Sequence, residues 1–288
     1  RCAPQATVEQ LCAPLTRRLI DEFIDPLCVS ALNTPAREAS GTVFLRVLQD
    51  SLFSGRGGSH LLLPRADLGA LFPEAAARWL QARGAQVRAG QRVQAIATDG
   101  RAWRVDGEPF DAVVLATPST EAARLARTVQ GTKPPQGWID QAEALRFIPI
   151  TTVYAQAQRA SGPVLPGPML ALRPQAGQPA QFVFDRGQLG GPKGLLAFVV
   201  SASEADRARV EAQVLAQAHA QLGLEGLQPL QTVVEKRATF ACTPGLRRPG
   251  PALAPGLWAC GDYTEGPYPA TLEGAVLSGG ATARRALG

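Results

Sequence analysis

The sequence is short of charge and has no long apolar run. Charged residues make up 18% of the 288 residues, against about 25% in a typical soluble chain, while 45% are hydrophobic. This composition argues for a packed globular protein and against disorder. No apolar stretch approaches the ~18 residues that a membrane-spanning helix needs. We therefore expect a chain that does not cross a membrane.

Patterns for metal binding, disulfides and common nucleophiles are also missing. The two histidines lack the spacing that places two ligands on one helix face, and no phosphate loop, nucleophile elbow or Cys/His pair suggests a hydrolase or an NTPase. The five cysteines are an odd number, are widely spaced and contain no C-x-x-C pattern: Cys2, Cys12, Cys28, Cys242 and Cys260. We expect reduced thiols, a cytoplasmic location and no metal site.

The net charge is weakly basic without a basic patch. The chain carries +5 at pH 7, but its arginines and lysines are scattered and are not interleaved with aromatic residues. Nucleic-acid partners are therefore not expected. A weak attraction to anionic membrane surfaces stays open.

Hydrophobic periodicity predicts helices in the first third of the chain and strands after it. Helical spacing predicts one helix from Thr7 to Ile24 and a second from Pro35 to about Ser51. Short strands are expected after Gly84. The run from Ala112 to Ala116 is apolar at every position, which predicts a strand buried on both faces, as in a layered α/β sheet.

The C-terminal segment combines a strand, a glycine and a helix. A strand ends in Gly261-Asp262, and an alanine-rich helix is expected from Thr271 to Leu287. A helix N-terminus after such a strand offers backbone N–H groups to an anion, and the Asp262 carboxylate suits a sugar or ribityl hydroxyl. Taken alone, the pattern is explained more simply by a turn and a helix cap.

Longer motifs add a family resemblance. The string GDYTEGPYPATLEGAVLSGG, from Gly261 to Gly280, resembles the C-terminal flavin segment of the FAD-dependent amine oxidase and phytoene desaturase superfamily. Together with EKRATFACTPGLRRPG, from Glu235 to Gly250, it is similar to the hydroxysqualene dehydroxylases. Segments from Pro26 to Phe53 and from Ser59 to Val87 extend the resemblance upstream.

The resemblance implies an FAD enzyme acting on a lipophilic isoprenoid. It implies reductive removal of the hydroxyl of hydroxysqualene to give squalene. A related flavin desaturase or amine oxidase on another apolar substrate stays open, as does a truncated, non-catalytic remnant that binds lipid or protein. Homo-oligomerisation and transient contact with the inner face of a membrane stay open as well.

The resemblance also implies roles for individual residues. Asp262 would bind the ribityl or pyrophosphate region, and Val93, on a strand from Arg92 to Ile96, would lie against adenine. The other expected cofactor-binding residues are Ala116, Thr117 and Pro118 at a strand end, then Gly261, Thr271, Leu272, Glu273, Gly274 and Ala275 around the C-terminal helix. The candidate catalytic acids are Glu235, Tyr263 and Tyr268.

One family element is missing from the sequence. These flavoproteins open with a βαβ unit that carries G-x-G-x-x-G, and the nearest glycine cluster, from Gly55 to His60, is better read as a surface turn. Because the chain starts with Arg1, we expect a cut end and a family member without its first dinucleotide-binding unit.

The implied fold is α/β, with an α+β substrate domain and a partial Rossmann-like FAD domain built from non-contiguous segments. Residues 1–84 would form the helical part of the substrate domain and 127–254 its sheet and helix. Residues 85–126 and 255–288 would contribute strands and the last helix to the FAD domain.

Overall fold

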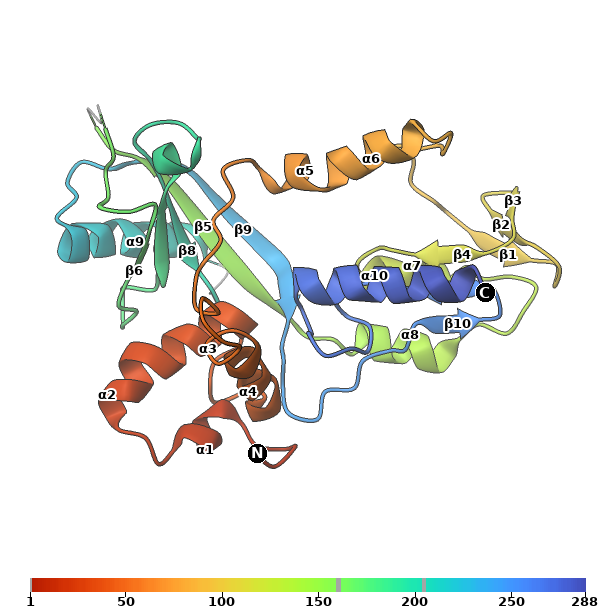
Figure 1. Cartoon of the computed structure of the whole chain (residues 1–288), viewed down its shortest axis with the longest axis horizontal. Coiled ribbons are helices and arrows are strands. Elements are labelled where there is room, and N and C mark those ends of the chain that lie inside the picture. The colour runs from red at the N-terminus through yellow and green to blue at the C-terminus, as the bar shows by residue number, and fades with distance from the viewer. Residues whose placement is uncertain (1, 159–161, 204–205) are drawn as a thin grey trace.

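The computed structural model describes residues 2–158, 162–203 and 206–288. Helices make up the first part of the chain (Figure 1): α1 (Val8–Cys12), α2 (Arg17–Leu19), the π-helical η1 (Ile20–Ile24), α3 (Asp25–Leu32), α4 (Gly41–Asp50), α5 (Leu68–Leu71) and α6 (Pro73–Gln81). Strands and helices alternate after it, so the expected α/β class is confirmed.

In the described residues, three sheets follow the helical part. The first is the antiparallel meander β1 (Ile96–Thr98), β2 (Trp103–Val105) and β3 (Glu108–Phe110). The second has the order β10 (Ala252–Ala254), β11 (Leu257–Ala259), β4 (Val113–Leu115), and it is accompanied by α7 (Ser119–Arg127), α8 (Gln136–Glu143) and α10 (Leu272–Ala286). The third has the order β6 (Met169–Ala171), β7 (Phe182–Asp185), β8 (Leu195–Val200), β5 (Phe147–Gln156), β9 (Gln228–Phe240), with η2 (Arg186–Leu189) and α9 (Arg207–Leu222).

The predicted helix from Thr7 to Ile24 is wrong as a single element. The chain leaves the helix around Pro14, and a continuous helical run from Arg17 to Leu32 then passes the predicted end. Pro26 fits inside this run because the N–H of Asp25 bonds the carbonyl of Ile20, five residues back. This π-type turn shifts the helical hydrogen bonds from i→i−4 to i→i−5 just before Pro26. The missing N–H of the proline therefore falls where the regular hydrogen-bond pattern is already interrupted.

Two other predicted elements also differ from the structure. The second helix begins at Gly41 and not at Pro35, because the Ser40 side chain accepts a hydrogen bond from the N–H of Val43 and so caps the helix there. The run from Ala112 to Ala116 is not covered on both faces: β4 lies at the end of its sheet, and Val114 is 39% exposed. Among the described residues no strand pairs with the outer edge of β4.

The residues that the structure describes form two apolar cores. One joins the N-terminal helices to the segments around β4, α7, α8 and β11, and includes Phe44, Leu115, Ile139 and Leu257. The other lies between the five-stranded sheet and α9. In the part of the chain that the structure describes, no helix has the length and apolarity needed to span a bilayer.

Asn33 fixes the helical part to the large sheet. It ends α3 in the left-handed conformation, with φ of 45°, and is buried. Its Nδ2 donates to the Ile148 carbonyl at 3.0 Å and to Thr239 Oγ1 at 2.9 Å, while its Oδ1 accepts from the N–H of Ala202 at 2.5 Å. One side chain therefore joins α3, β5, β9 and the segment after β8.

We expect Asn33→Ala to lower the free energy of unfolding by about 2–4 kcal/mol, because three hydrogen bonds of a buried side chain are lost together. Urea unfolding followed by circular dichroism measures this loss. Asn33→Gly is the control, since glycine tolerates the left-handed backbone but makes no side-chain bond. Wild-type stability in the glycine variant would show that backbone strain, and not hydrogen bonding, is what matters.

Asp185 is a second buried polar group, at the end of β7. Its carboxylate accepts hydrogen bonds from the backbone N–H groups of Val164, Leu165 and Gly187 and from the side chain of Gln188. Burial raises the pKa of Asp185, but these four donors outweigh burial and hold it below the ordinary value.

A pKa that is lower in the folded state stabilises the fold at pH values above the unfolded-state pKa, and this stabilisation is lost as the pH falls through the folded-state pKa. We therefore expect the free energy of unfolding to fall in acid below the ordinary aspartate range. Asp185→Asn should be less stable at neutral pH and should lose less on acidification. Parallel pH profiles for the two proteins would contradict this assignment.

Candidate functional site

The pairing of β4 with β11 brings two distant segments together. The strands run parallel with Val113 opposite Leu257 and Leu115 opposite Ala259, and the N–H of Cys260 continues the ladder to the Leu115 carbonyl at 3.1 Å. Their carboxyl ends therefore meet at one edge, which is where α/β sheets bind ligands. The loop from Gly261 to Ala270 and the N-terminus of α7 both start from this edge.

The predicted C-terminal helix has the expected bounds. Thr271 is its N-cap, and its Oγ1 accepts from the N–H of Gly274 at 2.9 Å. Because a helix leaves its first N–H groups without intrahelical partners, those of Leu272 and Glu273 remain available. Gly274 has no space for a side chain, since a Cβ there would lie 2.1 Å from the Tyr268 carbonyl oxygen.

Asp262 lies at the carboxyl end of β11 and is partly buried. Burial raises its pKa, against the opposing effects of its own N–H, the N–H of Tyr263 and the Arg248 guanidinium. Arg248 stabilises the same loop: it donates to the carbonyls of Asp262 at 3.3 Å, of Thr264 at 2.5 Å and of Gly266. Arg248 was not predicted as a site residue, because its contacts depend on tertiary structure.

Ala116, Thr117 and Pro118 lie between β4 and α7, beside the loop that carries Asp262. The next residue, Ser119, is buried, and its Oγ has no hydrogen-bond partner among the described residues. An unpartnered buried hydroxyl is uncommon in proteins.

A distortion of β9 brings the large sheet to the same edge. Ile148 pairs with Thr239 but Ile150 pairs with Glu235, so β9 carries extra residues between these two pairs. Arg237 lies in this bulge, and its Nη1 donates to Thr120 Oγ1 in the first turn of α7 at 3.2 Å. β-Bulges commonly redirect side chains next to functional sites.

Val93 lies on the segment before β1 and contacts α7. The expected strand from Arg92 to Ile96 is wrong in its bounds, since β1 begins only at Ile96. Arg124 of α7 donates to the Val93 carbonyl at 2.8 Å, and Val93 lines an open cavity of about 700 Å³ with Asp106 and Phe110 among its neighbours.

One face of the large sheet is apolar and is not covered by α9. Val153, Val183 and Phe198 point toward α9, so the alternate residues share the opposite face. The register aligns them in rows across the strands: Met169, Phe184, Ala197, Tyr154 and Gln231, then Ala171, Phe182, Val199, Thr152 and Val233, then Ile150 and Glu235. We call these residues the open sheet face.

The structure does not bring the three candidate acids together. Glu235 is exposed at the end of the open sheet face, two residues from Arg237. Tyr263 lies in the core with its ring edge-on to Trp138 at 6.2 Å, and burial raises the pKa of its unpartnered hydroxyl. Tyr268 is half-buried against α4, where its hydroxyl donates to Asp50.

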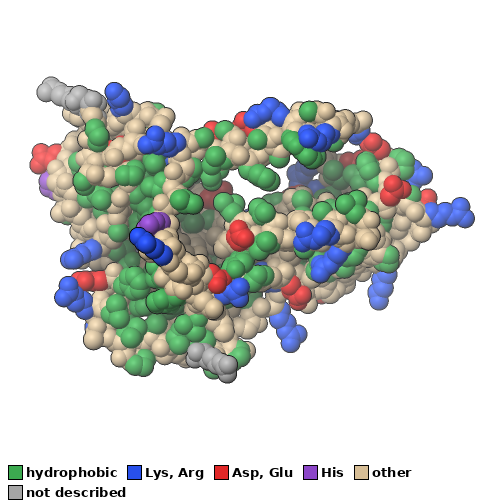
Figure 2. All heavy atoms as spheres, in the orientation of Figure 1, with side chains coloured by type: hydrophobic (Ala, Val, Ile, Leu, Met, Phe, Trp, Pro, Cys, Tyr) green, Lys and Arg blue, Asp and Glu red, His purple; other side chains and the backbone are tan. Residues whose placement is uncertain are grey.

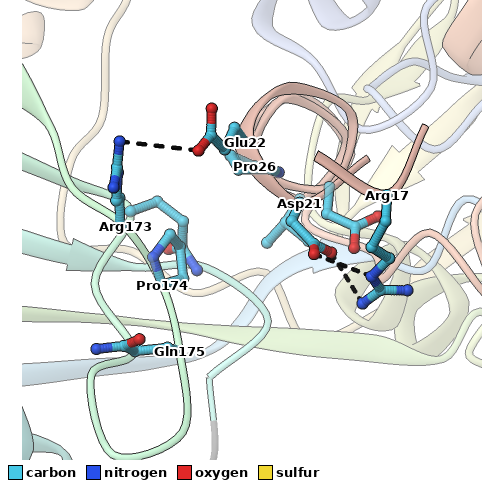
Figure 3. A pocket seen from close by; sticks show the side chains of 10 residues that line it. Arg17, Asp21, Glu22, Pro26, Arg173, Pro174 and Gln175 are labelled. Atoms are coloured by element: carbon cyan, nitrogen blue, oxygen red, sulfur yellow. Dashed lines mark hydrogen bonds and ion pairs between the residues drawn. The ribbon is translucent and has the colours of Figure 1, made fainter. Parts of the chain in front are cut away.

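A separate polar recess lies between η1 and the turn after β6 (Figure 3). Its volume is about 460 Å³, and Asp21 and Glu22 on its wall pair with Arg17 at 2.8 Å and with Arg173 at 3.8 Å. None of the predicted site residues lines this recess. Across the described residues, no cluster of His, Cys, Asp or Glu side chains could hold a metal ion.

The edge formed by β4 and β11 has the donors and acceptors that a dinucleotide flavin requires. The free N–H groups at the N-terminus of α10 and the Asp262 carboxylate both belong to segments that leave this edge. Gly274 lets the loop lie directly on the helix. These residues fit the flavin part of FAD.

Comparisons with known proteins agree with this geometry. The chain is 32% identical over 277 residues to a hydroxysqualene dehydroxylase of Rhodopseudomonas palustris, covering 91% of the chain and 61% of that protein. It is 29% identical to a hydroxysqualene dehydroxylase of Sinorhizobium fredii, covering 95% of the chain and 64% of that protein. The chain thus spans just over three fifths of these relatives' lengths.

The fold and family are clear from two further comparisons. An oxidoreductase from Methanosarcina mazei superposes with a TM-score of 0.68 at 16% identity, over 97% of this chain and 68% of that one, which shows the shared fold. The family model for flavin-containing amine oxidoreductases matches residues 9–287. This match confirms the expected family. The chain belongs to the flavin-containing amine oxidoreductase family.

Proposed function

We propose that this chain provides the substrate-binding part and the C-terminal flavin-binding part of an FAD-dependent hydroxysqualene dehydroxylase. Such an enzyme removes the hydroxyl of hydroxysqualene reductively and yields squalene, as in hopanoid-type isoprenoid synthesis. The names of the two curated relatives support this substrate. The observation that carries the proposal is the open sheet face, an apolar surface that ends at Glu235 beside the flavin-binding edge.

The open sheet face suits a long branched hydrocarbon and not a polar substrate. Phe182, Phe184 and Val199 present apolar surface, and burial of that surface against a hydrocarbon is favourable by about 25 cal/mol per Å². The same surface excludes water from a carbocation.

The domain division is part of the proposal. Residues 1–84 and 127–254 would bind the substrate, and 85–126 and 255–288 would bind FAD. The outer edge of β4 and the exposed side chains of Leu272, Val276 and Leu277 on α10 offer a place for a further parallel strand and its helix. We propose that a dinucleotide-binding unit in the longer protein occupies it, next to the opening below α5 and α6 in Figure 2.

The proposed roles follow from position. Asp262 would hold a ribityl hydroxyl, and the N–H groups of Leu272 and Glu273 would bind the pyrimidine edge. Glu235 would hold the proton that leaves with the substrate hydroxyl as water when the C–O bond breaks. Bound reduced FAD supplies the hydride that completes the reduction at that carbon.

The exposed loop after α4 carries large apolar side chains that suit contact with a membrane. Phe53, Leu61 and Leu62 are 76%, 71% and 94% exposed, and Arg56 lies between them in the sequence. We propose that this loop makes transient contact with an anionic membrane surface, from which a cytoplasmic enzyme would take its substrate.

We expect the 288-residue chain to lose added FAD during desalting, and to retain it when co-expressed with the βαβ unit of a hydroxysqualene dehydroxylase. The reason is that the pyrophosphate needs the glycine-rich turn of such a unit. Flavin absorbance after desalting measures the difference. Full retention by the chain alone would contradict the proposed division of the cofactor site.

In the flavin-loaded complex, we expect Glu235→Gln to lower turnover of hydroxysqualene by about 10²-fold or more, as for loss of a general acid. Substrate binding should change little, because the amide preserves shape. Squalene formed under anaerobic conditions is the measurement. Glu225→Gln, at an exposed carboxylate outside the open sheet face, is the control. Equal turnover in both variants would remove Glu235 from the mechanism.

A further inference from the structure

Three side chains connect α4 to the loop before α10. Arg46 and Asp50 lie one turn apart on α4 and form an ion pair. The Tyr268 hydroxyl donates to Asp50 Oδ2 at 2.9 Å and accepts from Arg46 Nη2 at 3.3 Å. The Arg46 guanidinium also lies 5.3 Å from the centre of the Tyr268 ring. We call these three residues the Arg46–Asp50–Tyr268 cluster.

The backbone of Tyr268 packs directly on the first turn of α10. Its carbonyl accepts from Thr271 Oγ1 at 2.9 Å, and the same Oγ1 accepts from the N–H of Gly274. Because a Cβ on Gly274 would lie only 2.1 Å from that carbonyl, the loop and the helix are in close contact. A displacement of Tyr268 would therefore move the N-cap of α10.

Ala270, which lies between Tyr268 and the N-cap Thr271, has a strained backbone. Ala270 has a φ of 56°, in the left-handed region that costs an L-residue roughly 1–2 kcal/mol. A non-glycine residue keeps such a conformation only when its surroundings hold it there. The N–H of Ala270 reaches the Asp262 carbonyl at 3.3 Å, and Tyr268 is held from the other side by α4.

We infer that Arg46 and Asp50 are positioning residues, which act through Tyr268 to hold the free N–H groups of Leu272 and Glu273 where the flavin binds. This inference rests on the proposed function. It assigns Tyr268 a role in positioning and not in proton donation, because its proton is already directed at the Asp50 carboxylate. It also makes α4, in the helical part of the chain, a support for the flavin-binding helix.

Hydrogen–deuterium exchange on the flavin-free 288-residue chain tests the inference. We expect Tyr268→Phe and Asp50→Ala to accelerate amide exchange at Gly274 and Ala275, whose N–H groups bond Thr271, by roughly five- to tenfold, as for the loss of one or two hydrogen bonds. Asp21→Ala is the matched control, since Asp21 forms the same kind of pair with Arg17, at 2.8 Å, far from α10 in the sequence. Amides of β5 report whether each variant is folded.

A conservative variant at Asp50 separates hydrogen bonding from charge. Asp50→Asn keeps an acceptor for the Tyr268 hydroxyl, so its amides at the start of α10 should keep most of their protection from exchange. If only the charge of Asp50 mattered, this variant would lose that protection. Unchanged exchange at Gly274 and Ala275 in Tyr268→Phe, or equal acceleration there in Asp21→Ala, would overturn the inference. Failure of the flavin-loaded complex to reduce hydroxysqualene would instead contradict the proposed function, because the exchange measurement contains no flavin or substrate.

Discussion

The parallel pairing of β4 with β11 is the interaction on which the rest of the structure depends. Parallel strands cannot be joined by a tight turn and need a crossover connection. Here the connection contains α7, α8, the whole five-stranded sheet and α9. The N-terminus of α7 and the loop of Asp262 become neighbours only because this pair forms. The candidate flavin edge is therefore a product of tertiary structure and not of any one segment.

Buried or half-buried polar side chains then fix the large sheet and the helices relative to that pair. Asn33 bonds three backbone or side-chain partners from separate elements, and Arg248 holds three successive parts of the loop after β11. Both mainly bond backbone groups, and the cost of leaving buried backbone groups unpaired makes such contacts specific. The contact between the large sheet and the segment after β4 is made by Arg237, which donates from the bulge of β9 to Thr120 in α7.

Local signals in the sequence were sufficient for some elements and insufficient for others. The C-terminal strand, Gly261-Asp262 and α10 follow from adjacent residues; α10 has the predicted bounds, and β11 ends at Ala259, two residues before Gly261. The π-turn that admits Pro26 has no such signal. The open sheet face also escaped prediction, because it depends on the register of five strands. Arg237 and Arg248 stood among other charged residues, and only the bulge in β9 and the folded loop distinguish them.

The exposed edge of β4 has a consequence for synthesis on the ribosome. β4 is translated roughly 140 residues before β11, a delay of about 7–30 s at 5–20 residues per second. During that interval the nascent chain carries an apolar strand whose parallel partner does not yet exist. A long strand in that position would invite pairing between neighbouring nascent chains. The three-residue length of β4 limits this hazard while it waits for β11.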